Sequence, residues 1–111
     1  MSRRTIAIAA ALSVLALGSP LITVNANPLA RQYFNQGVEK IEEGNYQVAI
    51  ADFTEVIEIN PQYAYVYYWR GVARELVKDL AGTCSDCRKA ADFGLKESAH
   101  CVKNHCLGLA L

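Results

Sequence analysis

The sequence repeats itself at an interval of 34 residues, and this periodicity is its most restrictive feature. The aligned pairs are Ala30 with Ala64, Tyr33 with Tyr67, Phe34 with Tyr68, Gly37 with Gly71, Val38 with Val72 and Asp52 with Asp86. Within one period, apolar residues recur at three- and four-residue steps on both sides of a break at Gly44 and Asn45, which indicates two amphipathic helices joined by a turn. The sequence therefore predicts an all-α chain. Its helices are expected near residues 28–43, 46–59, 62–78, 80–93 and 96–107.

The first period, residues 30–63, resembles the tetratricopeptide repeat (TPR), a helix–turn–helix unit of this length. The marker residues of that family are present as Tyr33, Gly37, Tyr46, Ala49, Phe53 and Pro61. Two positions depart from the pattern: Gln36 stands where leucine is usual and Val56 where alanine is usual. The second period, residues 64–97, keeps Tyr67 and Gly71 but has Thr83 and Cys87 at the alanine and phenylalanine positions. The resemblance implies one domain over 27–111, with two TPR repeats and a capping helix over 98–107, as a fragment of an α-solenoid.

In TPR proteins the first helix of each pair lines a concave groove that binds a protein or peptide partner. Carried over position by position, the groove residues are Arg31, Phe34, Val38, Ile41, Glu42, Tyr65, Tyr68, Val72, Glu75 and Leu76, with Trp69 beside them. Some TPR proteins grip acidic chaperone tails with Lys, Arg and Asn, but the matching positions here are Phe34, Val38 and Trp69, which cannot form such a clamp. The resemblance therefore implies an interaction module or assembly adaptor for an apolar or aromatic-anchored peptide. A further hypothesis is self-association into a homo-oligomer through Tyr65, Tyr68 and Trp69, because tyrosine and tryptophan are enriched in binding hot spots.

The four cysteines, all beyond residue 83, admit three chemistries. Cys84, Cys87, His100 and His105 have the spacing of a zinc finger, but the core residues and the hairpin of a finger are missing. A Cys-x-x-Cys pair at a helix start also occurs in thiol–disulfide enzymes, but the strand–helix setting of those enzymes is absent. Structural disulfides are the favoured interpretation, and a thiol–disulfide or metal-binding protein of the cell envelope is the alternative.

The sequence alone does not determine which cysteines pair with one another. The segment from Cys84 to Gly94 resembles the closing repeat of exported bacterial TPR proteins, and that resemblance implies a bridge between Cys84 and Cys106. If the last two helices pack antiparallel, Cys87 faces Cys101 in a nested arrangement. Residues 84 and 87 are about 60° apart around a helix, whereas 101 and 106 are about 140° apart. Nesting therefore requires the last helix to fray near Cys106.

The first 26 residues have the layout of a secretory signal peptide. Arg3 and Arg4 precede an apolar run over residues 6–17, a break follows at 18–20, and Val24-Asn25-Ala26 offers a cleavage site after Ala26. An uncleaved N-terminal anchor is the second interpretation of this segment. Cleavage would place the mature chain in the periplasm or outside a bacterial cell, where disulfides persist and no membrane contact is needed.

The charge balance excludes a nucleic-acid partner. The whole chain has 11 basic and 11 acidic residues, and removal of residues 1–26 leaves a formal charge of −2. Phosphate binding requires a clear excess of Lys and Arg. No catalytic triad, paired carboxylates or phosphate-binding loop is present, so we expect neither an enzyme nor a cofactor or metal site.

Overall fold

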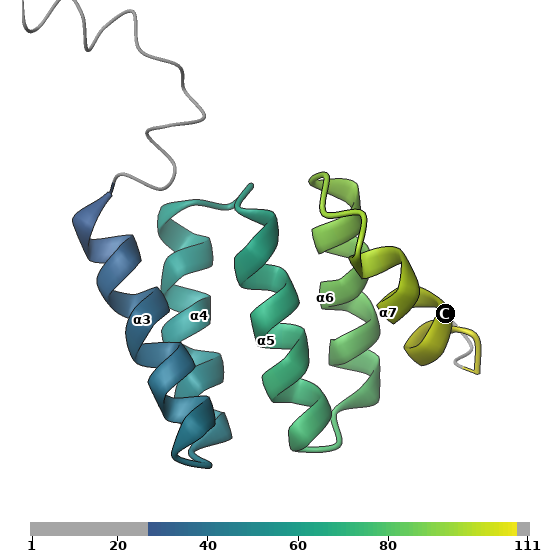
Figure 1. Cartoon of the computed structure of the whole chain (residues 1–111), viewed down its shortest axis with the longest axis horizontal. Coiled ribbons are helices and arrows are strands. Elements are labelled where there is room, and N and C mark those ends of the chain that lie inside the picture. The colour runs from purple at the N-terminus through teal and green to yellow at the C-terminus, as the bar shows by residue number, and fades with distance from the viewer. Residues whose placement is uncertain (1–26, 109–111) are drawn as a thin grey trace, which may run out of the picture.

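The computed structural model describes residues 27–108, and within this range every regular element is a helix (Figure 1). The helices are α3 (Pro28–Glu42), α4 (Tyr46–Ile59), α5 (Ala64–Leu76), α6 (Leu80–Asp92) and α7 (Ser98–Cys106). The all-α prediction is confirmed. The third and fifth predicted helices were too long, because each begins two residues later than expected. The predicted signal peptide lies outside the described residues.

Local chemistry explains where several helices begin and end. Asn27 caps α3 by accepting hydrogen bonds from the backbone N–H groups of Leu29 and Ala30, at 2.9 and 3.1 Å. Asp79 caps α6 by accepting from the N–H of Gly82 at 3.0 Å. After α3, Gly44 adopts a φ of +83°, a left-handed conformation that favours glycine and turns the chain into α4.

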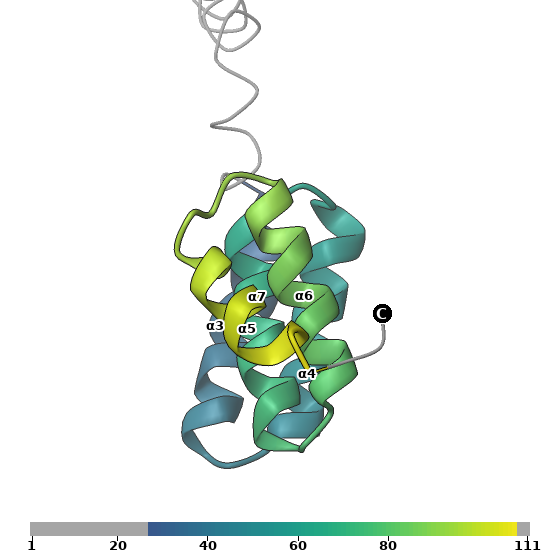
Figure 2. The same ribbon diagram turned by 90° about the vertical axis from the view of Figure 1, so that its right-hand side faces the viewer.

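The helices form two layers (Figure 2), with α3, α5 and α7 in one layer and α4 and α6 in the other. Each helix packs against the next one in the chain. The core between the layers is centred on Phe53, Val56 and Val66, which are fully buried. Gly37 lies against the ring of Phe53, and a Cβ atom at that position would come within 2.6 Å of the ring. This close approach explains why a glycine is needed in the first repeat.

Among residues 27–108, no helix has both the length and the apolar character needed to span a bilayer. The longest of them, α3, has 15 residues, fewer than the about 20 that a hydrocarbon core requires.

Candidate binding groove

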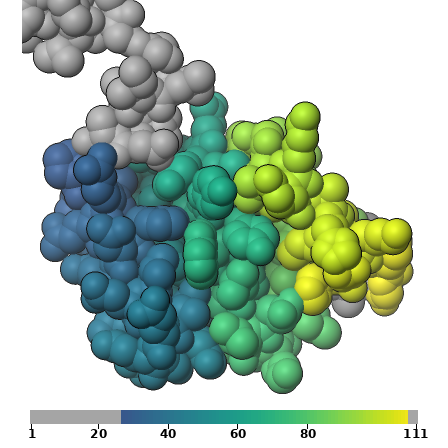
Figure 3. Space-filling model, in the orientation of Figure 1, coloured from purple at the N-terminus to yellow at the C-terminus, as the bar shows by residue number. Residues whose placement is uncertain are grey.

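The groove residues expected from the sequence lie on the layer of α3, α5 and α7, which faces the viewer in Figure 3. Arg31, Glu42, Tyr65 and Leu76 are exposed, with Tyr65 and Leu76 at 51% and 42%. The other members are half-buried: Phe34, Val38, Ile41, Tyr68, Trp69, Val72 and Glu75. The predicted set therefore contains both exposed and partly covered side chains.

The α3 part of this face is mainly structural. Phe34 packs against the rings of Phe53 and Tyr63, with centroids 5.8 and 5.9 Å apart. Val38 and Ile41 also pack against the core. These three side chains therefore help to hold the first helix pair together.

The α5 part of the face borders a hollow of about 190 Å³ between α5 and α7. Its wall on α5 contains Tyr68, Val72 and Glu75, and its wall on α7 contains His100, Asn104 and His105. A second hollow of about 160 Å³ is lined by Tyr65, Tyr68, Leu95 and Glu97. The two hollows share Tyr68 and Glu97, and we call the combined depression the α5–α7 groove.

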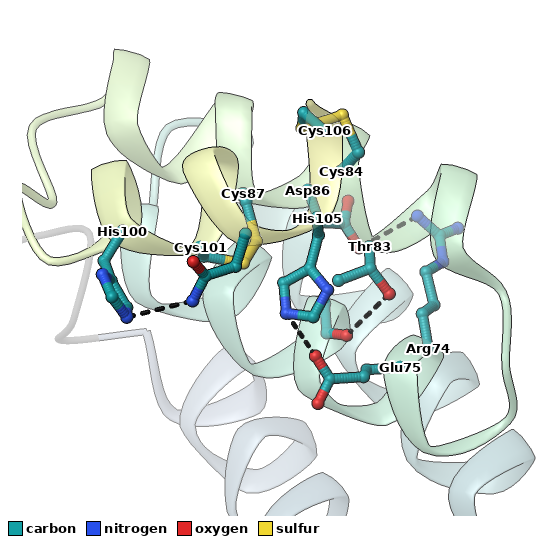
Figure 4. The surroundings of a disulfide bond; sticks show 12 residues. Arg74, Glu75, Thr83, Cys84, Asp86, Cys87, His100, Cys101, His105 and Cys106 are labelled. Carbon is teal, nitrogen blue, oxygen red and sulfur yellow. Dashed lines mark hydrogen bonds and ion pairs between the residues drawn. A yellow bond between two sulfur atoms is a disulfide. The ribbon is translucent and has the colours of Figure 1, made fainter. Parts of the chain in front are cut away.

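A polar contact joins the two walls of the α5–α7 groove, and a second lies within the α7 wall (Figure 4). Nε2 of His105 on α7 contacts the carboxylate of Glu75 on α5. Nε2 of His100 lies 3.0 Å from the side-chain nitrogen of Asn104, one turn further along α7. His100 is exposed, as expected of a histidine on the last helix, whereas His105 is half-buried by its contact with Glu75.

The cysteines fix the position of the α7 wall. The structure joins Cys84 to Cys106 and Cys87 to Cys101, with Cα–Cα distances of 5.1 and 5.8 Å. The expected fraying near Cys106 is wrong, because α7 continues as a helix through Cys106. Instead, α7 crosses α6 obliquely (Figure 1). An oblique crossing lets two positions far apart around α7 meet two positions close together on α6.

The geometry does not favour catalysis or metal binding by these cysteines. Cys84 and Cys87 each pair with α7 and not with one another, and both are buried. A redox-active Cys-x-x-Cys must instead open and close its own bridge at an accessible site. No group of His, Cys, Asp and Glu suited to a metal ion occurs within residues 27–108.

An ion-pair cluster behind the groove holds α5 to α6. Asp86 is 1% exposed, and its carboxylate accepts hydrogen bonds from Arg70 and Arg74 at 2.8 to 3.0 Å. Arg70 also donates to the hydroxyl of Thr54 on α4 at 3.2 Å and lies over the ring of Tyr67. This cluster orients α5, whose opposite side carries the groove residues.

Sequence reasoning missed the part of the groove beyond α5. The missed residues are Leu95, Glu97, His100, Asn104 and His105. A further step of 34 residues would have placed Ser98 with Ala64 and Val102 with Tyr68. That alignment identifies α7 as the equivalent of α5 in the next unit, and therefore as a wall of the same face.

A family model described as a TPR repeat matches residues 33–76, which covers most of α3 and all of α4 and α5. The match supports the TPR resemblance for these helices and leaves α6 and α7 outside it. No curated protein matches the chain. TPR repeats are in general scaffolds for protein–protein interaction.

Proposed function

We propose that the protein is an exported interaction module of TPR type, which binds a segment of a partner protein in the α5–α7 groove. The observation that carries this proposal is the pair of adjoining hollows between α5 and the C-terminal part of the chain. Tyr65, Tyr68 and Val72 line the α5 side, and Leu95, Glu97 and residues of α7 line the other. Tyrosine side chains supply large contact area at low entropic cost, and such residues dominate binding energy at protein interfaces. We assign the chain no catalytic role.

Rigidity supports the proposal. The Asp86 cluster fixes α5 from behind, and two disulfides fix α7 against α6. Both walls of the groove are therefore held in place before a ligand arrives. Preorganisation of this kind reduces the ordering cost of binding. Export of the chain is part of the proposal, because the N-terminal residue pattern is that of a signal peptide and disulfides persist outside the cytosol.

The experiment is a selection from a library of random peptides displayed on phage, with the oxidised full chain immobilised. Selected peptides are then measured by fluorescence polarisation against Tyr68→Ala. We expect binding to weaken at least tenfold, since a hot-spot aromatic contributes about 2 kcal/mol or more. The matched control is Val48→Ala, which truncates an exposed apolar residue on α4, in the other layer, and should leave affinity unchanged.

Circular dichroism and thermal unfolding of each variant establish that the fold is kept. Failure to select any peptide, or equal affinities for Tyr68→Ala and the parent protein, would overturn the groove as the binding site. A dimer in sedimentation that Trp69→Ala dissolves would instead support self-association through the aromatic residues of α5.

A further inference from the structure

The second hollow of the groove combines features that suit one kind of side chain. Two tyrosines, an aliphatic residue and a carboxylate line it: Tyr65, Tyr68, Leu95 and Glu97. Tyr65 is 51% exposed and Glu97 is also exposed, so a ligand can reach both. Within residues 27–108, neither phenol hydroxyl makes a hydrogen bond, and the Glu97 carboxylate has neither a hydrogen bond nor an ion pair.

From this arrangement we infer that the hollow binds an arginine side chain of the partner segment. The inference rests on the proposed function and specifies the chemistry of the ligand. Guanidinium groups stack on aromatic faces and pair with carboxylates through a planar fork of N–H donors. The Glu97 carboxylate accepts from that fork, and the tyrosine rings provide the stacking surface. Leu95 covers the aliphatic stem, which long basic side chains bury along apolar surface.

The charges of the side chains that line the hollow agree with a cationic ligand. The titratable side chains that line the two hollows are Tyr65, Tyr68, Glu75, Glu97, His100 and His105, so neither lysine nor arginine is among the lining residues. Glu75 lies in the adjoining hollow, where His105 contacts it. An acidic peptide would bring a like charge to Glu97, whereas an arginine supplies the missing opposite charge.

The same chemistry already operates inside the fold. Arg70 lies 5.8 Å from the ring centroid of Tyr67 and donates to both carboxylate oxygens of Asp86. That internal group consists of one guanidinium, one tyrosine and one aspartate. The groove has the tyrosines and a glutamate but no guanidinium, which an arginine of the partner would supply.

The test is an NMR titration of the ¹⁵N-labelled full chain with acetyl-Gly-Arg-Gly-amide. The matched probe is acetyl-Gly-citrulline-Gly-amide, which keeps the shape of arginine and removes its charge, and ionic strength is held equal. We expect the arginine probe to shift the amide signals of Tyr65, Tyr68 and Glu97, and the citrulline probe to bind several-fold more weakly. In Glu97→Gln, the affinity for the arginine probe should fall about fivefold, the upper range for an exposed ion pair.

Glu58→Gln is the control, because it removes an exposed carboxylate from α4 in the other layer and should leave the titration unchanged. Tyr65→Leu, at an exposed position that does not endanger folding, should also weaken the arginine probe. Equal binding of the two probes, no shifts at all, or equal losses in Glu97→Gln and Glu58→Gln would overturn the inference. Peptides selected from the random library that lack a basic residue would overturn it too, while the proposed function would stand.

Discussion

Arg70 holds Asp86 through two hydrogen bonds, from Nε to Oδ2 at 3.0 Å and from Nη2 to Oδ1 at 2.8 Å. The two residues are 16 positions apart and belong to α5 and α6. Arg74 adds a third hydrogen bond to Oδ2 at 2.9 Å. A buried carboxylate is costly to desolvate unless it is paired and hydrogen-bonded, and this one is satisfied by two cations. The pair therefore links α5 to α6, the helix that carries two of the cysteines.

Replacement of Asp86 by asparagine should lower the free energy of unfolding by about 3 kcal/mol, because it leaves the guanidinium group of Arg70 without its counter-charge and leaves Arg74 only the more distant, exposed carboxylate of Asp79, at 3.8 Å. Urea denaturation of the oxidised protein measures the change. The control is Asp92→Asn, at an exposed position of the same helix, which should change stability by less than about 0.5 kcal/mol. Equal effects of the two substitutions would show that the Asp86 cluster contributes nothing to stability.

Gly37→Ala should destabilise the protein by about 2 kcal/mol. The new methyl group would lie 2.6 to 2.9 Å from three atoms of the Phe53 ring, which is fully buried and cannot move aside without displacing the core. Alanine is the better helix former, so the loss must exceed a gain of about 1 kcal/mol in helix propensity. Thermal unfolding measures the loss of stability, and the control is Asn35→Ala, at an exposed position of α3. A stabilised Gly37→Ala variant would contradict the close packing of α3 on α4.

Much of this architecture could be predicted from the sequence because its cause is local. Three- and four-residue apolar spacing and the break at Gly44 and Asn45 are properties of neighbouring residues, so the number and order of the helices followed from them. The structural importance of Gly37 followed from the resemblance to TPR proteins, in which this position is a marker glycine. Helix ends were less accurate, since the third predicted helix began at residue 62, two positions before α5.

The remaining features depend on contacts between distant residues. Asp86 appeared in the sequence only as the repeat of Asp52, and its burial requires arginines that α5 supplies. The α7 wall of the groove depends on the oblique crossing of α7 over α6, and helix periodicity does not determine that angle. Glu97 therefore could not be recognised as a groove residue until α7 was placed.

The hydroxyl of Tyr67 donates a hydrogen bond to the carbonyl oxygen of Pro61 at 2.6 Å. The pKa of Tyr67 is raised above its ordinary value of 10.0, mainly by burial; the positive charge of Arg70 lowers it and the negative charge of Asp86 raises it. The folded chain thus holds the phenolic proton more tightly than the unfolded chain does. This contribution to stability is fully present below pH 10 and is lost as the pH rises through the raised pKa.

We therefore expect the free energy of unfolding to fall as the pH rises above 10, and Tyr67→Phe to reduce the slope. Below that pH the variant should lose about 1 kcal/mol for the missing hydrogen bond. Urea denaturation at a series of alkaline pH values measures both effects. Burial also raises the pKa of Tyr63, which remains in the variant. Part of the pH dependence of the free energy of unfolding should therefore remain. An unchanged slope in Tyr67→Phe would refute the assignment to this side chain.

The nested cysteine pairing can be read directly from a digest of the unreduced protein. Cleavage before aspartate and after lysine or arginine separates all four cysteines, because Asp86 lies between Cys84 and Cys87 and Lys103 lies between Cys101 and Cys106. Mass spectrometry should find peptide 79–85 linked to 104–111, and peptide 86–88 linked to 97–103. Links of 79–85 to 97–103 would show a crossed pairing and a different placement of the α7 wall.

The N-terminal segment and the thiol state can be tested together by an intact mass of the protein from its own host. We expect a chain that begins at Asn27, because the residues before it have the layout of a cleaved signal peptide. Two disulfides make that chain four hydrogen atoms lighter than its reduced form. Comparison with the same sample after reduction supplies the control. A mass that retains residues 1–26 would indicate a membrane anchor, and four free thiols or an added zinc ion would favour cysteine chemistry over a fixed α7 wall.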